Sequence, residues 1–289
     1  KEKKGLPLQA FFHQGGHGGP PPMKLMNRWF TRYLFGVQNG VEKDPRAWIV
    51  REGKKRTEPT PYDDYPNPKA APVRLYLGPG GNGTGRLGFK ARAGQGAEKL
   101  IDNYEFKGAT LASEAKSEHR LLYATGRLSR PVHLSGTSSI RIKVSSSQPA
   151  ANLSVWLVSL PWTKGGRTND NLISRGWADP QNHESLRESK PLEPGKFYEL
   201  SFDFQPDDQV IPVGQRIGLM IFSSDKDFTL WPKPGTELTV ELGATSIELP
   251  VVGGPRALRR ATTPKRRRLS APRKPIFHPL PGTNGSGRF

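Results

Sequence analysis

The chain has 289 residues, no cysteine, 32 glycines, 28 prolines and a formal net charge of +18. Without cysteine it cannot form a disulfide, a thiolate metal site or a cysteine nucleophile. Its length suits one large or two modest domains, and the Gly and Pro content favours short strands joined by turns over a helical bundle. The N-terminal residues lack the apolar segment of a signal peptide. Neither they nor the composition identify a compartment, so the localisation stays unknown.

The positive charge is concentrated at the C-terminal end. Ten Lys and Arg lie between Arg256 and the C-terminus, where no acidic residue occurs, so the rest of the chain carries the remaining +8. We therefore expect no specific nucleic-acid partner. Residues 255–289 lack hydrophobic periodicity and predict a basic, disordered tail. No apolar run approaches the about 20 residues that span a bilayer, so we expect no transmembrane segment.

Residues 1–56 read as the end of an α/β domain. Residues 8–12 form a short apolar run typical of a buried strand. After a glycine-rich turn, residues 23–36 have apolar side chains at helical spacing, with Gly36 where a helix would end. Residues 45–53 then predict a second strand. The order is strand, loop, helix, strand, which belongs to an α/β protein.

Residues 57–72 form a proline-rich linker that argues against regular structure. Residues 73–254 have the pattern of an all-β domain, and the turns between the predicted strands contain Gly, Pro, Asn and Asp. The alternation is clean in two stretches, with Ile140, Ile142 and Val144 on one face and Leu153, Val155 and Leu157 on another. Eight strands with long connections predict a two-sheet sandwich of the jelly-roll type. The predicted strands are 73–77, 121–128, 139–146, 152–160, 196–205, 215–224, 236–243 and 245–250.

Two histidines, His13 and His17, lie four residues apart in the stretch FFHQGGHGGPPP. This spacing binds zinc when both residues lie on a helix, but the surrounding glycines oppose a helix and no carboxylate lies in the turn. We therefore expect neither a metal site nor a cofactor. In the α/β-hydrolase order, the triad histidine follows the serine and the acid, on a loop after the final strands. His17 fits that placement, although an exposed histidine in a flexible loop would fit equally.

Other candidate sites are weaker. Gly83, Gly85 and Gly88 spell G-x-G-x-x-G, but no helix follows to receive a pyrophosphate, so we interpret them as part of a mobile surface loop. His119, His133 and His183 have no obvious partner in the sequence. Four tryptophans are candidates for a ligand groove, although core or rim positions are more usual for this residue. They are Trp156, Trp162, Trp177 and Trp231.

Several stretches, taken in order, resemble Xaa-Pro dipeptidyl-peptidases, serine peptidases related to cocaine esterase. The resemblance covers residues 8–254 and leaves out the tail. It implies a mainly β chain, in which a jelly-roll sandwich (73–254), of the galactose-binding-like type, follows the C-terminal strand, loop and helix of an α/β-hydrolase domain. The stretches are FFHQGGHGGPPPMKLMNRWFTRYLFGVQNGVEKDPRAWIVREG, PYDDYPNPKAAPVRLYLG, YATGRLSRPVHLSGTSSIRIKVSSSQPAANLSVWLV, SRGWADP and PVGQRIGLMIFSSD.

The resemblance also implies a function. His17 matches the triad histidine of the family, while the serine, the aspartate and the oxyanion donors would lie upstream of Lys1. The complete enzyme would cleave X-Pro dipeptides from the N-termini of proline-containing peptides, and this chain would be inactive alone. Its partner would be the upstream α/β-hydrolase domain. Phe11, Phe12, Trp29 and Leu34 would pack on that domain.

Two alternatives remain open from the sequence. One is a related acyl hydrolase of the same architecture that acts on α-amino-acid esters or β-lactams. The other is a noncatalytic β-sandwich binding module, for which Trp162 and Trp177 are the candidate ligand contacts. The oligomeric state is not indicated by the sequence.

Overall fold

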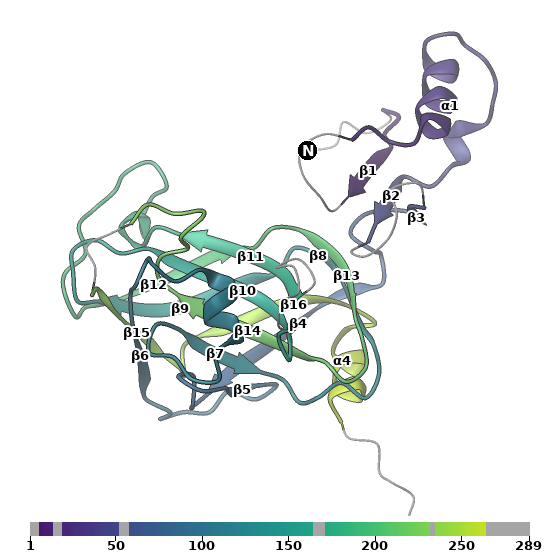
Figure 1. Cartoon of the computed structure of the whole chain (residues 1–289). Coiled ribbons are helices and arrows are strands. Elements are labelled where there is room, and N and C mark those ends of the chain that lie inside the picture. Colours follow the sequence, from purple (N-terminus) through teal and green to yellow (C-terminus); the bar gives the residue numbers. More distant parts are fainter. Residues whose placement is uncertain (1–5, 14–18, 52–57, 164–170, 232–234, 264–289) are drawn as a thin grey trace, which may run out of the picture.

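The computed structural model describes residues 6–13, 19–51, 58–163, 171–231 and 235–263. A small N-terminal sheet holds strands β1 (Ala10–His13), β2 (Ala47–Val50) and β3 (Thr60–Tyr62). Strands β1 and β2 are parallel and are connected through helix α1 (Met23–Tyr33), whereas β3 is antiparallel to β2. This α/β unit lies beside a much larger β-sandwich (Figure 1). The predicted strand, loop, helix, strand order is therefore confirmed.

The sandwich contains the remaining strands, of which ten pair along one continuous path and β8 joins that path at β16. Its order is β11-β10-β14-β7-β5-β4-β16-β9-β15-β6, with β12 and β13 attached to β9 and β8. The predicted fold class, a mainly β sandwich behind a short α/β segment, is confirmed. The strands are β4 (Ala70–Gly78), β5 (Gly85–Gly88), β6 (Ala97–Ile101), β7 (Leu121–Ala124), β8 (Val132–Gly136), β9 (Ser139–Ser146), β10 (Leu153–Leu160), β11 (Leu172–Ala178), β12 (Phe197–Asp203), β13 (Asp207–Ile211), β14 (Arg216–Phe222), β15 (Glu237–Glu241) and β16 (Ser246–Val252).

The main core follows from the alternation of apolar residues along the strands. Ile140, Ile142 and Val144 of β9 belong to the same buried cluster as Leu153, Val155 and Leu157 of β10. Both sets predicted from the sequence therefore point into one interior. Because successive side chains of a strand point to opposite faces, the intervening residues of β10 need a second cover.

Helix α2 (Gly108–Ser113) lies over that other face. Trp156 and Val158 of β10 pack in a second buried cluster with Leu111 of α2 and Phe222 of β14. All eight residues of β10 are buried as a result. A strand covered on both sides reads as a continuous apolar run, as LSVWLVSL does.

The linker prediction for residues 57–72 is wrong in part. Strand β3 lies inside this range, and β4 begins at Ala70. Pro61 sits in β3 opposite Trp48, on a strand whose only partner in the described sheet is β2. A sheet edge tolerates proline, because a missing N–H there removes no hydrogen bond of the ladder.

The predicted disorder of residues 255–289 is wrong for their first part. Helix α4 (Gly254–Thr262) begins after Gly253, whose φ of 81° favours glycine, and has proline in its first turn. It buries Leu258 and Ala261, three residues apart, in the main core. Because arginines surround these two residues, the short apolar face is difficult to recognise in the sequence. Residues 264–289 lie outside the described residues.

The G-x-G-x-x-G match is not a dinucleotide loop, because Gly85–Gly88 is strand β5 and no helix follows it. The interpretation of these glycines as a mobile loop also fails for Gly85. A Cβ on Gly85 would lie 2.6 Å from the carbonyl oxygen of Gly78 and from the ring of Tyr123. Close packing, not phosphate binding, accounts for this glycine.

A buried arginine holds the turn before β5 in place. Arg120 has no exposed surface, and its Nη1 donates to the carbonyl oxygens of Gly81 at 2.8 Å and Gly83 at 2.6 Å. Its Nε and Nη2 donate to the carbonyl oxygens of Leu111 and Glu114 at 3.1 Å and 2.7 Å. Buried carbonyl groups need hydrogen-bond donors. The side chain of Arg120 supplies them to two chain segments, residues 81–83 and residues 111–114.

We expect the substitution Arg120→Met to destabilise the sandwich by about 3–5 kcal/mol, because it leaves several buried carbonyls without a donor. The free energy of unfolding, measured in urea, should fall with an unchanged m-value. The control is Arg74→Met, which breaks the exposed Arg74–Glu248 pair and should cost about 0–1 kcal/mol. Equal losses in the two variants would contradict this role of Arg120.

Candidate functional site

The two sequence-predicted histidines lie at and after the end of β1. His13 is the last residue of β1 and pairs in register with Val50 of β2. His17 follows four residues later and lies outside the described residues. In α/β proteins, ligands bind beyond the carboxyl ends of parallel strands. The loop of His17 thus begins at the edge of the sheet where such sites form.

One side of this small unit is apolar and open. A cavity of 240 Å³ lies between α1 and the sheet, lined by Phe11, Leu25, Trp29 and Trp48 among others. No residue of α1 is buried. Two buried side-chain nitrogens, His13 Nδ1 and Trp48 Nε1, have no hydrogen-bond partner among the described residues. Buried polar atoms normally have partners, so this face resembles the inner surface of a larger domain.

The exposures agree with the packing expected from the sequence. Phe12 is 44% exposed and Leu34 is 70% exposed. Phe11 and Trp29 are half-buried at the cavity. Large apolar side chains in such positions forgo about 1.5–3 kcal/mol each relative to full burial.

Polar contacts fix α1 to the segment before β2. Arg28 donates from Nε and Nη2 to the carboxylate of Asp44, at 2.6 Å and 3.1 Å. Arg32 forms an ion pair with Glu42, and Asn39 donates to the carbonyl oxygen of Arg28 at 2.7 Å. The hydrogen bonds and ion pairs of α1 therefore lie on its polar side, while its apolar side lines the open cavity.

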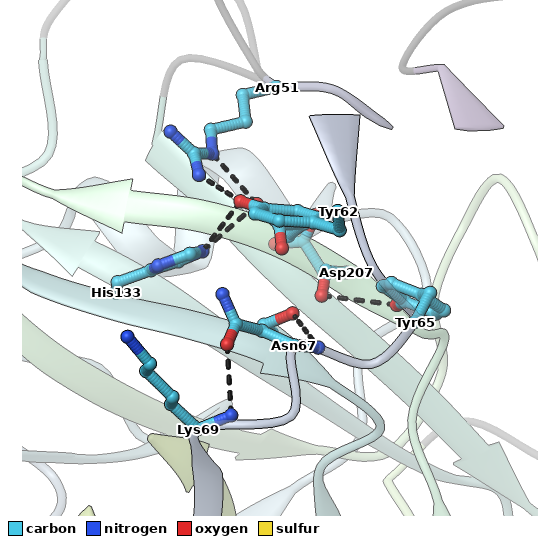
Figure 2. Close-up of polar contacts among 9 residues, drawn as sticks. Arg51, Tyr62, Tyr65, Asn67, Lys69, His133 and Asp207 are labelled. Atoms are coloured by element: carbon cyan, nitrogen blue, oxygen red, sulfur yellow. Dashed lines mark hydrogen bonds and ion pairs between the residues drawn. The ribbon is translucent and has the colours of Figure 1, made fainter. Parts of the chain in front are cut away.

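A polar junction connects the small sheet to the sandwich (Figure 2). At its centre is Asp208 of β13, whose side chain is 1% exposed. Its Oδ1 accepts from Arg51 Nε at 2.8 Å, from the hydroxyl of Tyr62 at 3.2 Å and from His133 Nε2 at 3.0 Å. Arg51 also donates to the hydroxyl of Tyr62. Arg51 and Tyr62 belong to the small sheet region, and His133 lies on β8.

The electrostatics of the junction favour an ionised Asp208. Burial alone would raise the pKa of its carboxyl, but hydrogen bonds from His133, Ser135 and Arg51 outweigh burial and leave that pKa below its usual value. Burial and two nearby aspartates raise the pKa of Tyr65 to about 12, so its neutral hydroxyl donates to the carbonyl oxygen of Asp207 at 3.3 Å. A backbone contact from Asn67 N to Ser135 Oγ, 3.0 Å long, extends the junction along the linker.

The four candidate tryptophans do not line one groove. Trp156 is 3% exposed, and both Trp156 and Trp177 donate from Nε1 to Oδ2 of Asp225, at 3.0 Å and 3.1 Å. Burial raises the pKa of Asp225 against the effect of these two donors. Trp231 is 56% exposed and stacks on Tyr104, with ring centroids 5.0 Å apart. Trp162 packs against the second core cluster.

The junction is the part of the site that the sequence analysis missed. Arg51 and Asp208 are 157 positions apart, so no local spacing connects them. His133, interpreted as a histidine without a partner, contacts Asp208. Within the described part of the chain, no group of three or more His, Cys, Asp or Glu is arranged to hold a metal ion. No helix in the described ranges is long and apolar enough to cross a bilayer.

Comparison with known proteins shows which family this chain is similar to. Residues 39–268 match the family model of the X-Pro dipeptidyl-peptidase C-terminal non-catalytic domain. A putative Xaa-Pro dipeptidyl-peptidase of Rhodopirellula baltica is 58% identical over 88% of this chain and 41% of its own length. One of Bacillus anthracis is 33% identical over 86% of this chain and 40% of its own length. The chain thus spans about two fifths of these relatives.

Solved structures show the same fold at low sequence identity. An aminopeptidase from a marine sediment Thaumarchaeota archaeon superposes with a TM-score of 0.62 at 20% identity, over 80% of this chain and 44% of that one. The family model covers most of the described sandwich and reaches back to the residues before β2. The chain therefore belongs to the family of X-Pro dipeptidyl-peptidase C-terminal domains.

Proposed function

We propose that this chain is the C-terminal part of a serine dipeptidyl-peptidase that cleaves X-Pro dipeptides from peptide N-termini. The names of the relatives support this activity, and so does the order of β1, the loop of His17, α1 and β2. The triad serine and aspartate would belong to the portion of the relatives that this chain does not span. The sandwich would pack against that portion.

In this proposal, His17 is the general base and acid. Its imidazole takes the proton of the serine hydroxyl during attack on the peptide carbonyl and then gives it to the departing amine. An imidazole without a nucleophile cannot perform either step. The chain alone is therefore expected to be inactive toward X-Pro substrates.

The observation that carries the proposal is the open face of the small sheet. The apolar cavity beside α1, with the unpartnered His13 Nδ1 and Trp48 Nε1 nearby, is the surface on which the hydrolase domain would pack. Such packing would cover the exposed Leu34 and supply hydrogen-bond partners for the two buried nitrogens.

Through the junction, the sandwich would hold the small sheet in position. The loop of His17 follows β1, β1 pairs with β2, and Arg51 directly after β2 is bound to Asp208 of the sandwich. Tyr62 of β3 is bound to the same carboxylate. We infer that Asp208 anchors the sheet from which the catalytic loop extends.

A chimera tests the activity. Residues 8–289 would be joined behind the N-terminal portion of the Rhodopirellula baltica relative, and hydrolysis of a Gly-Pro anilide would be measured. We expect turnover by the chimera, none by this chain alone, and a loss of at least about 10³-fold in kcat for His17→Ala, because the base is removed.

The matched control is His13→Ala at the end of β1, for which we expect a far smaller loss in kcat. Full activity of His17→Ala, or turnover by the unfused chain, would contradict the assignment. An aryl ester serves as second substrate, and a strong preference for it would favour an ester hydrolase instead.

The anchor is tested by Asp208→Asn in this chain. The substitution removes the charge that Arg51 and Tyr62 bind, so amide hydrogen exchange in β2 and β3 should accelerate about tenfold or more. Exchange in β10, inside the sandwich core, should stay unchanged. Asp203→Asn, the same change at an exposed position of β12, should leave all three strands unaffected. Unaltered exchange in β2 would contradict the anchor.

The lowered pKa of Asp208 gives a pH dependence with a definite sign. Its ionised form stabilises the fold fully above the unfolded pKa of about 3.9, and this contribution is lost as the pH falls through the lower folded pKa. We expect the difference in unfolding free energy between wild type and Asp208→Asn to be constant from about pH 5 to 7 and to shrink below about pH 4. Urea unfolding at each pH measures it, and a difference that grows on acidification would contradict it.

A further inference from the structure

A second cavity lies at the corner of the sandwich where α4 packs. It has a volume of 300 Å³ and is bounded by three chain segments: β5 with the residues after it, the turn after β7, and α4. Its charged lining residues are Arg86, Lys90 and Arg259, and all three are cationic. Thr125 and Thr262 add two hydroxyl-bearing side chains to the wall. A cavity of this size suits a small molecule or part of one.

Hydrogen bonds and a ring contact connect these segments to one another and to β14, so the cavity is built from folded parts. Ser129 donates from N and Oγ to the carbonyl oxygen of Ala261, at 2.7 Å and 2.9 Å. Arg216 Nε donates to the carbonyl oxygen of Thr125 at 2.8 Å. The guanidinium of Arg259 lies 4.2 Å from the centroid of the Phe89 ring, which orients it at the cavity.

The charge of this corner is not balanced. The segments 85–92, 125–130 and 254–263, together with the first residue of β14, contain no Asp or Glu. Among the described residues, no ion pair involves any of their cations, whereas Arg74, Arg141 and Lys143 on the sandwich are all paired. The cations of these segments are Arg86, Lys90, Arg92, Arg127, Arg130, Arg216, Arg256, Arg259 and Arg260, of which Arg86, Lys90 and Arg259 line the cavity.

The dipole of α4 explains only part of this arrangement. Cations near a helix C-terminus are stabilised by its carbonyl groups, and Arg259 and Arg260 lie in the last turn of α4. Ser129, however, already donates to those carbonyls. Arg86 and Lys90 come from β5 and the residues after it, so the helix does not account for them. Arg127 also contributes to a lowered pKa of Arg216, after burial as the main cause, which indicates mutual repulsion of the cations.

We propose that this corner binds a phosphate group, either of a small soluble ligand or of a lipid head group. Guanidinium groups match phosphate oxygens with paired hydrogen bonds, and a lysine ammonium adds a compact positive charge. A doubly charged anion in the cavity would supply the counter-charge that Arg86, Lys90 and Arg259 lack among the described residues. Part of the positive charge that the sequence assigns to a tail thus lies on the folded helix α4.

The test is a titration of the full chain with inorganic pyrophosphate at physiological salt, followed by calorimetry and by NMR of the arginine side chains. We expect saturable binding with one site per chain and shifts of the Nε–Hε signals of Arg86 and Arg259. The double variant Arg86→Gln/Arg259→Gln should weaken binding by at least about tenfold, because two charge-assisted contacts are lost.

The matched control is Arg74→Gln/Arg141→Gln, which removes the same charge at paired arginines elsewhere on the sandwich and should change affinity less than about twofold. Equal weakening in both double variants, or none in the first, would show attraction by net charge alone and overturn the proposal. Vesicles containing phosphatidic acid, compared with phosphatidylcholine vesicles, identify the source. Binding to them that requires Arg86 and Arg259 indicates a lipid head group, and pyrophosphate binding without vesicle binding indicates a soluble phosphate ligand.

Discussion

One carboxylate oxygen, Oδ1 of Asp208, joins the two parts of this chain. It lies in the sandwich but accepts hydrogen bonds from Arg51 and Tyr62, which belong to the region of the small sheet. A buried carboxylate is costly unless it is paired and hydrogen-bonded, so these partners are required by the burial itself. The orientation of the small sheet relative to the sandwich follows from that requirement, since the sheet must bring Arg51 and Tyr62 to the aspartate.

The sandwich can act as a fixed support because its core is closed on both sides. The residues of β10 alternate between the main core and the cluster under α2, and none of them is exposed. Arg120 fixes the turn before β5 in a similar way, through hydrogen bonds to the carbonyl oxygens of Gly81 and Gly83. The small sheet lacks this closure, because α1 buries no residue and one face stays apolar and open. The sandwich is thus the closed support, whereas the small sheet presents an open apolar face.

The sequence was sufficient to predict the elements that obey a short period. The alternation at Ile140, Ile142 and Val144 and the helical spacing in residues 23–36 both report packing that neighbouring residues share, and both were confirmed. The junction could not be predicted, because Arg51 and Asp208 meet only through the fold of the whole sandwich. The helix α4 was missed because its apolar face is only two residues wide, at Leu258 and Ala261, within an arginine-rich stretch. The loop of His17 stays a prediction that rests on its place after β1.

The junction at Asp208 and the corner at α4 differ in how their charge is balanced. This difference distinguishes a structural contact from a candidate binding site. At the junction, the negative charge of Asp208 is paired with Arg51 inside the chain, while its buried Oδ2 has no hydrogen-bond partner among the described residues. At the corner of α4, cations from two of the three lining segments face one cavity, and none of these segments contains a carboxylate. Self-repulsion of this kind lowers stability unless a counter-charge is supplied from outside. A protein that keeps such a cluster beside well-paired arginines on the same sandwich is built to receive an anion there.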